Sequence, residues 1–190
     1  MRVPANQLDQ IFHPMIAPKA KLILLGKGLG ASPGAAAGKI VFTPERAQEL
    51  ADKKEKVILV RMETSPEDIH GMSVAQGILT AKGGMTSHAA VVARAMGKPC
   101  VSGVSALEIN AKRKTCKLGD IQLKELDWVT LDGTTGRVIK GAAPLIQSRL
   151  TSNFTRMMTW AGEIRSLEIR ANADTPHDAL MARDFGAQGI

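Results

Sequence analysis

The segment Gly83–Gly97, GGMTSHAAVVARAMG, places one histidine between a double-glycine turn and a run of alanine and valine. Small and apolar residues at this spacing predict a helix from Ser87 to Met96, with Ser87 as its N-cap and the final glycine as its end. Short apolar runs lie on both sides, at Gly77–Ala81 and at Cys100–Val104. A strand, a turn, a helix and a second strand in this order indicate an α/β domain.

The same alternation continues outward from this segment. Further strands are expected at 39–42, 56–61, 115–118, 128–131 and 137–140, and further helices after the N-caps Thr43 and Ser65. The chain from Leu25 to Gly38 is rich in glycine but fits no phosphate-loop spacing, so it is expected to be irregular chain that leads into a strand. One compact α/β domain should therefore occupy residues 21–142, after a proline-interrupted linker at 1–20.

Composition limits the kinds of partner. The net charge of +7 suits an anionic partner, although a soluble surface rich in lysine also explains it. Aromatic residues make up only 3 %, which argues against binding of single-stranded nucleic acid. Cys100 and Cys116 lack metal-ligand spacing, so we expect buried free thiols and no metal site. There is no secretory signal, and no apolar run approaches the roughly 20 residues that span a bilayer.

His88 is the first residue of the expected helix, directly after Ser87. There the free N–H groups of the first turn and the helix dipole favour an anion and disfavour a cationic imidazole. The neutral ring is the nucleophilic form, so the position suits a histidine that carries a phosphoryl group. Two alternatives stay open at this point: an inert histidine at the start of an ordinary helix, and a Ser87–His88 dyad, for which no acid partner is evident.

The neighbouring residues fit the same chemistry. Thr86 and Ser87 offer hydroxyl donors. Gly83 and Gly84 let the backbone turn sharply without side chains in the way. Arg94 follows further along the helix, where it is either a partner in a structural salt bridge or a phosphate ligand.

The last part of the chain has a different character. A helix is expected at 147–166, then a strand at 167–172 and a helix that begins after the N-cap Thr175. A strand followed by a helix is the opening of a βα unit, which cannot bury its apolar face alone. The sequence is therefore expected to be truncated at its C-terminus.

Four segments carry a resemblance to a known family. They are GGMTSHAAVVARAMGKPCVSG at 83–103, VRMETSPEDIHGM at 60–72, GLGASPGAAAGKIVF at 28–42 and RANADTPHDALMARDFGAQGI at 170–190. The first resembles the phosphohistidine motif of the pyruvate, phosphate dikinases, which are phosphoenolpyruvate-utilising enzymes, and the second resembles the segment before that motif. The third resembles the start of their central swivelling domain, and the fourth the opening strand and helix of their C-terminal barrel.

The resemblance implies a fold and a reaction. The fold would be α/β, with a swivelling phosphohistidine β/β/α domain at 21–142, and a linker helix and the first βα unit of a truncated (β/α)8 barrel at 143–190. The full enzyme would reversibly convert ATP, phosphate and pyruvate to AMP, diphosphate and phosphoenolpyruvate through a phosphohistidine at His88. Supporting that group would be Gly83, Gly84, Thr86, Ser87 and Arg94. Arg170 would contact phosphoenolpyruvate at the end of the first barrel strand.

The same resemblance implies that the rest of the machinery lies elsewhere in the full enzyme. The Mg²⁺ ligands, the nucleotide-binding domain and most of the phosphoenolpyruvate/pyruvate domain are expected outside this chain, which alone should not turn over. The full enzyme would be a homodimer in the cytoplasm or in an organelle such as a plastid or glycosome, with no nucleic-acid or membrane partner. Two alternatives remain: a carrier domain of phosphoenolpyruvate synthase or another phosphoenolpyruvate-utilising phosphotransferase, and a non-catalytic anion-binding module.

Overall fold

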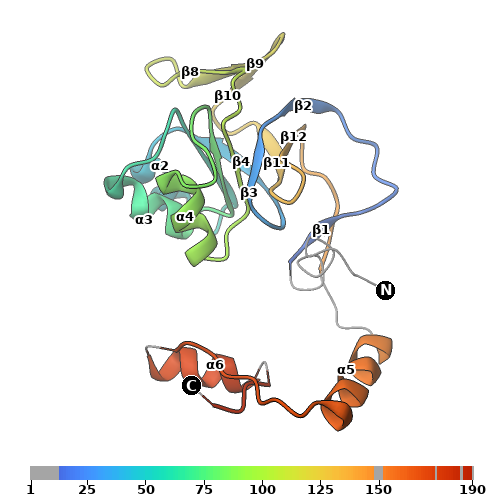
Figure 1. Ribbon diagram of the computed structural model, residues 1–190. Helices are drawn as coiled ribbons and strands as arrows, with labels where there is room; N and C mark the ends of the chain where they lie inside the picture. The colour runs from blue at the N-terminus through green and yellow to red at the C-terminus, as the bar shows by residue number, and fades with distance from the viewer. Residues whose placement is uncertain (1–12, 148–151, 174, 185, 190) are drawn as a thin grey trace. The chain divides into compact units, whose positions relative to one another are not determined.

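The computed structural model describes residues 13–147, 152–173, 175–184 and 186–189 (Figure 1). The chain divides into two units, Met1–Arg149 and Leu150–Ile190, and each is described by itself. Most of the linker expected at 1–20 lies outside the described residues, because the description begins at His13.

The first unit is built on an eight-stranded sheet in the order β2-β12-β11-β4-β5-β6-β7-β3. The strands are β2 (Leu24–Lys27), β3 (Leu29–Ser32), β4 (Ala35–Val41), β5 (Val57–Arg61), β6 (Gly77–Thr80), β7 (Cys100–Ser102), β11 (Trp128–Asp132) and β12 (Arg137–Lys140). Neighbouring strands from β4 to β7 run parallel, and the remaining pairs are antiparallel. The strands expected within this set are confirmed, although β4 begins earlier than expected.

Helices cover one face of this sheet (Figure 1). They are α2 (Pro44–Asp52), the 3₁₀ turn η1 (Pro66–Asp68), α3 (Ile69–Val74) and α4 (His88–Ala95). The expected N-caps are confirmed: the Thr43 hydroxyl accepts from Arg46 N at 3.2 Å, and Asp68 Oδ2 accepts from Ser65 N at 2.9 Å. Each cap satisfies backbone N–H groups that the first turn leaves without partners, which is why short polar residues start these helices.

A three-stranded antiparallel sheet covers the other face. Its strands are β8 (Leu107–Asn110), β9 (Thr115–Leu118) and β10 (Ile121–Lys124), in the order β10-β9-β8. Strand β5 shows how the layers share the core, because Val57 and Leu59 pack with the helices whereas Ile58 and Val60 pack with the small sheet. Alternate residues of a strand point to opposite faces, so a continuous apolar run is needed between two layers. The expected α/β class is confirmed, with β/β/α layering.

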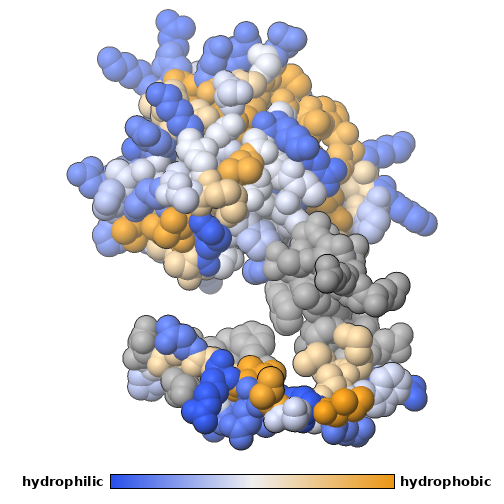
Figure 2. Space-filling model, viewed as in Figure 1, coloured by the Kyte–Doolittle hydropathy of each residue, from blue (hydrophilic) through white to orange (hydrophobic). Residues whose placement is uncertain are grey.

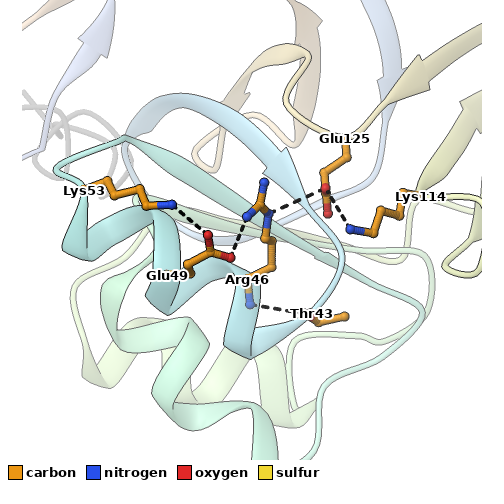
Figure 3. Close-up of polar contacts among 6 residues, drawn as sticks. All are labelled: Thr43, Arg46, Glu49, Lys53, Lys114 and Glu125. Atoms are coloured by element: carbon orange, nitrogen blue, oxygen red, sulfur yellow. Dashed lines mark hydrogen bonds and ion pairs between the residues drawn. The ribbon is translucent and has the colours of Figure 1, made fainter.

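Charged side chains join α2 to the small sheet at the surface (Figure 3). Arg46 contacts Glu49 of the same helix at 2.5 Å and Glu125, just after β10, at 3.6 Å. Lys53 and Lys114 extend the network from either side, to Glu49 at 2.8 Å and to Glu125 at 3.4 Å. Hydrogen bonds from Lys53 and Arg46 lower the pKa of Glu49 to about 2. An exposed pair such as Lys53–Glu49 contributes little to the stability of the fold.

The glycine-rich segment 25–38 is not irregular chain, so that expectation was wrong. It forms β2, β3 and the start of β4. The glycines serve close packing, since a Cβ on Gly30 would lie 2.5 Å from the carbonyl oxygen of Gly133. Strands β2 and β3 stand at opposite edges of the sheet although only Gly28 separates them, so the sheet curves until these edges meet at that residue.

The two segments that flank this domain are paired with each other. Strand β1 (Met15–Ile16) runs antiparallel to β13 (Leu145–Ile146). Ala17 N also donates to Pro144 O at 2.9 Å, and Ala35 N of β4 donates to Pro14 O at 2.8 Å. The chain therefore enters and leaves the domain side by side.

The second unit contains α5 (Ser152–Ile164) and α6 (Pro176–Asp184). The Thr175 cap is confirmed by a hydrogen bond from Asp178 N to Thr175 Oγ1 at 3.2 Å. The strand expected at 167–172 is wrong. Among the described residues, this segment forms only an isolated parallel bridge between Arg170 and Gly189, because it finds no neighbouring strand there with which to make a ladder.

Apolar side chains remain exposed on the second unit, where Figure 2 shows several orange patches. Among them are Met157, Met158, Trp160 and Ile164. In the part of the chain that the structure describes, no helix is long and apolar enough to cross a membrane.

Candidate functional site

The candidate site lies where the parallel strands of the main sheet end. Strand β5 ends at Arg61 and β6 ends at Thr80. The loop after β5 carries Thr64, and the loop after β6 carries the glycine turn and leads to His88 at the start of α4. Parallel strands end at the same edge of a sheet, so side chains far apart in sequence meet there.

The glycine turn packs closely against its surroundings. Gly83 has φ +116°, and a Cβ there would lie 2.9 Å from Oγ and Cβ of Ser87. On its other side, a Cβ on Gly103 would lie 2.6 Å from Gly83 O. A Cβ on Gly84 would meet no atom within 4 Å. The two glycines therefore differ: Gly83 has no room for a side chain, whereas Gly84 has.

Helix α4 begins as the sequence predicts. Ser87 is the N-cap, and its Oγ accepts from Ala90 N at 3.4 Å. His88 is the first helical residue and is half-buried, whereas Thr86 is exposed. The ring therefore stands beside the unpaired N–H groups of the first helical turn.

The His88 ring is held from one side. Its Nδ1 lies 3.0 Å from Thr64 Oγ1, and the direction of this hydrogen bond depends on the tautomer of the ring. Among the described residues Nε2 has no hydrogen-bond partner. One nitrogen is thus fixed and the other is available for chemistry.

Thr64 is a site residue that the sequence reasoning missed. It is 9 % exposed and sits directly before the capping turn at Ser65. That turn is anchored by Asp68, whose Oδ1 pairs with Arg61 Nε at 3.1 Å, and Arg61 in turn donates to Phe42 O at 3.2 Å. The only signal in the sequence is its place in the loop after a parallel strand, next to the loop that carries the histidine.

Arg94 fastens the glycine turn to α4. Its Nε donates to Ala90 O at 3.0 Å, and its Nη2 donates to Met85 O. Within the described ranges it makes no ion pair, so its structural contacts are hydrogen bonds to carbonyls and not the salt bridge considered from the sequence. The bond to Met85 fixes the backbone that leads into His88.

The family comparison matches the part of the chain that builds this site. Residues 53–136 match the family model described as "PEP-utilising enzyme, mobile domain". Residues 53–136 belong to the mobile domain of the phosphoenolpyruvate-utilising enzymes. The matched region of this mobile domain includes Thr64, His88 and Arg94.

Curated relatives of this chain are named pyruvate, phosphate dikinase. The protein of Rhizobium meliloti (strain 1021) is 50 % identical over 189 residues, that of Giardia intestinalis 52 % over 190 residues, and that of Clostridium symbiosum 50 % over 192 residues. Each match covers 100 % of this chain but only 21 % or 22 % of the relative. The chain therefore spans about a fifth of the length of the relatives it matches.

A solved structure is also similar to part of this chain. It is titled "NMR solution structure of Enzyme I (nEIt) protein using two 4D-spectra" and shows 25 % sequence identity with a TM-score of 0.33. The match covers 60 % of this chain and 40 % of that chain.

Arg170 belongs to the second unit and not to the mobile domain. Its side chain is 70 % exposed and lies 3.6 Å from Glu168 Oε2. The residues around His88 and this arginine are therefore separate parts of the chain.

Neither cysteine of the mobile domain suits catalysis or metal binding. Both are free and buried, as expected. Burial raises the pKa of the Cys100 thiol to about 12 and that of the Cys116 thiol to about 11, so both stay protonated at neutral pH. The described residues contain no group of three or more His, Cys, Asp or Glu that could hold a metal ion.

Proposed function

We propose that this mobile domain is a phosphoryl carrier and that Nε2 of His88 bears the phosphoryl group. The observation that carries the proposal is the contact of 3.0 Å between Nδ1 and Thr64 Oγ1. It occupies one ring nitrogen and leaves the other as the nucleophile.

The contact also selects a protonation state. In the reactive tautomer Nδ1 carries the proton and donates it in a hydrogen bond to Thr64 Oγ1, while Nε2 keeps its lone pair. Nε2 then attacks phosphorus, the N–P bond forms as the bond to the leaving oxygen breaks, and no proton has to move. A fixed ring orientation lowers the entropy cost of this attack.

The surroundings favour the negative charge that the ring would gain. His88 is the first residue of α4, and the unpaired N–H groups of that turn carry partial positive charge. An anion at such a position gains about 0.3–1 kcal/mol from the helix dipole. The N-cap Ser87 adds a hydroxyl next to the ring. The open space at Gly84 leaves room for the phosphoryl group.

The whole protein would be a pyruvate, phosphate dikinase, which the identity of about half the residues to proteins of that name favours over phosphoenolpyruvate synthase. In this proposal ATP, phosphate and pyruvate are converted reversibly to AMP, diphosphate and phosphoenolpyruvate, and His88 carries first a pyrophosphoryl and then a phosphoryl group. This chain alone would be labelled but would not turn over. Arg170 would serve the phosphoenolpyruvate/pyruvate domain.

The other parts of the machinery would lie outside this chain. In this proposal the Mg²⁺ ligands belong to other domains of the full enzyme, which would be a homodimer. The domain would move between the nucleotide-binding and the phosphoenolpyruvate/pyruvate domains on its flanking linkers. The pairing of β1 with β13 supports this, because one short ribbon would let both linkers bend together.

Label transfer tests the proposal. The chain is mixed with a separately made nucleotide-binding domain, Mg²⁺, phosphate and ATP labelled at the β-phosphorus. Acid-labile, base-stable label on the chain, lost in His88→Ala, is the expected result. The control is that the same donor domain labels the intact enzyme. If it then leaves this chain unlabelled, the non-catalytic anion-binding alternative is favoured.

A further inference from the structure

A polar cavity lies at the edge of the main sheet opposite to the edge that carries His88. Its lining includes residues that directly precede parallel strands, namely Lys56 before β5 and Gln76 before β6, and also Lys98 shortly before β7. The cavity has a volume of about 690 Å³. Pockets of roughly 300–1,000 Å³ hold organic ligands, so this one is too large for a bare inorganic ion.

Both linkers wall this cavity. His13 and Pro14 come from the first linker, and Leu145 and Gln147 come from the second. These walls are attached to the domain, because Pro14 O accepts from Ala35 N at 2.8 Å and β1 pairs with β13. The cavity is therefore formed by hydrogen-bonded parts of the first unit alone.

The charged side chains that line the cavity are all positive. Lys56 and Lys98 contribute ammonium groups, and no acidic residue belongs to the described lining. Neither lysine has an ion-pair partner among the described residues. Burial lowers the pKa of Lys98, which means that its charge is desolvated without a carboxylate in compensation.

The lining also has an apolar part. Ala35–Ala37, at the start of β4, and Trp128, a residue that is 36 % exposed, belong to this part. An indole beside cationic groups is suited to the organic body of a ligand whose charged end meets the lysines.

We propose that this cavity binds a small phosphorylated organic molecule, with Lys98 and Lys56 on the phosphate and its organic part against the alanines and Trp128. The proposal does not depend on phosphoryl transfer by His88. Because both linkers form the wall, a bound molecule would also tie them to the domain and slow amide hydrogen exchange in β1 and β13.

Fluorescence of Trp128 measures binding directly. The chain has two tryptophans, so Trp160→Phe leaves Trp128 as the only reporter, and His88→Ala removes the proposed carrier group. The probes are AMP and ribose 5-phosphate, with adenosine and ribose as unphosphorylated counterparts. We expect a saturable change with at least one phosphorylated probe and none with its counterpart.

Charge-removing variants identify the site. Lys98→Gln should weaken binding about tenfold or more, as loss of a charge-assisted hydrogen bond does. Lys56→Gln, at an exposed position, should weaken it too and keeps the test decisive if Lys98→Gln fails to fold. Lys117→Gln, at an exposed position of β9, is the control and should bind like the parent. Binding of neither phosphorylated probe, equal binding of the counterparts, or unchanged affinity in both lysine variants would overturn the proposal.

Discussion

Thr64 Oγ1 lies 3.0 Å from Nδ1 of His88, although Thr64 lies in the loop after β5 and His88 begins the helix that follows β6. The sheet brings them together because β5 and β6 are parallel neighbours and end at the same edge. The threonine thereby decides which ring nitrogen is free, and it becomes the second residue of the proposed carrier site.

Replacement of this threonine should slow phosphorylation without unfolding the domain. Thr64→Val keeps the shape but removes the hydroxyl, and loss of one hydrogen bond of about 0.5–1.5 kcal/mol predicts a labelling rate up to about tenfold lower. The rate of label transfer to His88 measures this. Thr64→Ser is the matched control and should restore most of the rate. A Val variant labelled at the parental rate would show that the contact does not matter.

The two glycines of the turn should respond differently to alanine. Gly83→Ala forces a left-handed φ of +116° and a clash with Ser87, so it should destabilise the domain by about 1–3 kcal/mol. Gly84→Ala meets nothing within 4 Å and should change the free energy of unfolding by less than about 0.5 kcal/mol. Urea denaturation measures both. Equal losses of unfolding free energy in the two variants would contradict the steric difference between Gly83 and Gly84.

Arg94 offers a way to separate a structural role from a ligand role. Arg94→Gln removes the bonds to Met85 O and Ala90 O, so amide hydrogen exchange at residues 85–87 should become faster than in the parent. Mass-spectrometric or NMR exchange measurements check this. If exchange stays unchanged while phosphorylation is lost, Arg94 acts on the phosphoryl group and not on the turn.

The buried thiol of Cys100 should make stability depend on alkaline pH. Its pKa in the folded domain, about 12, lies above the ordinary value of 9.0, so the folded state keeps the proton longer than the unfolded state. Its contribution is therefore complete below about pH 9 and falls as pH rises toward 12. Urea denaturation at a series of pH values should show a steeper alkaline loss in the parent than in Cys100→Ala. Parallel curves would contradict burial of a protonated thiol.

The features that sequence reasoning predicted are local ones. The caps at Thr43, Ser65 and Ser87 depend on side-chain oxygens and backbone N–H groups within three residues, so their signal lies in a few letters. The apolar runs of β5 and β6 are equally plain, since both faces of these strands are buried.

The features that it missed depend on distant partners. Strands β2 and β3 pair with β12 and β7, and their glycines are there for close backbone contact with segments far along the chain. Thr64 has no distinctive neighbours of its own, and its partner is 24 residues away. The strand expected at 167–172 failed for the same reason, because a strand needs a neighbour that the local sequence does not contain.

The most direct measurement is NMR of the phosphorylated chain with ¹⁵N-labelled histidine, after transfer from the nucleotide-binding domain and ATP. A ¹⁵N–³¹P coupling at Nε2 of His88, together with a proton on Nδ1 that exchanges faster in Thr64→Val, is the predicted result. Phosphorus on Nδ1, or on another residue, would contradict the assignment of His88 Nε2 as the carrier atom.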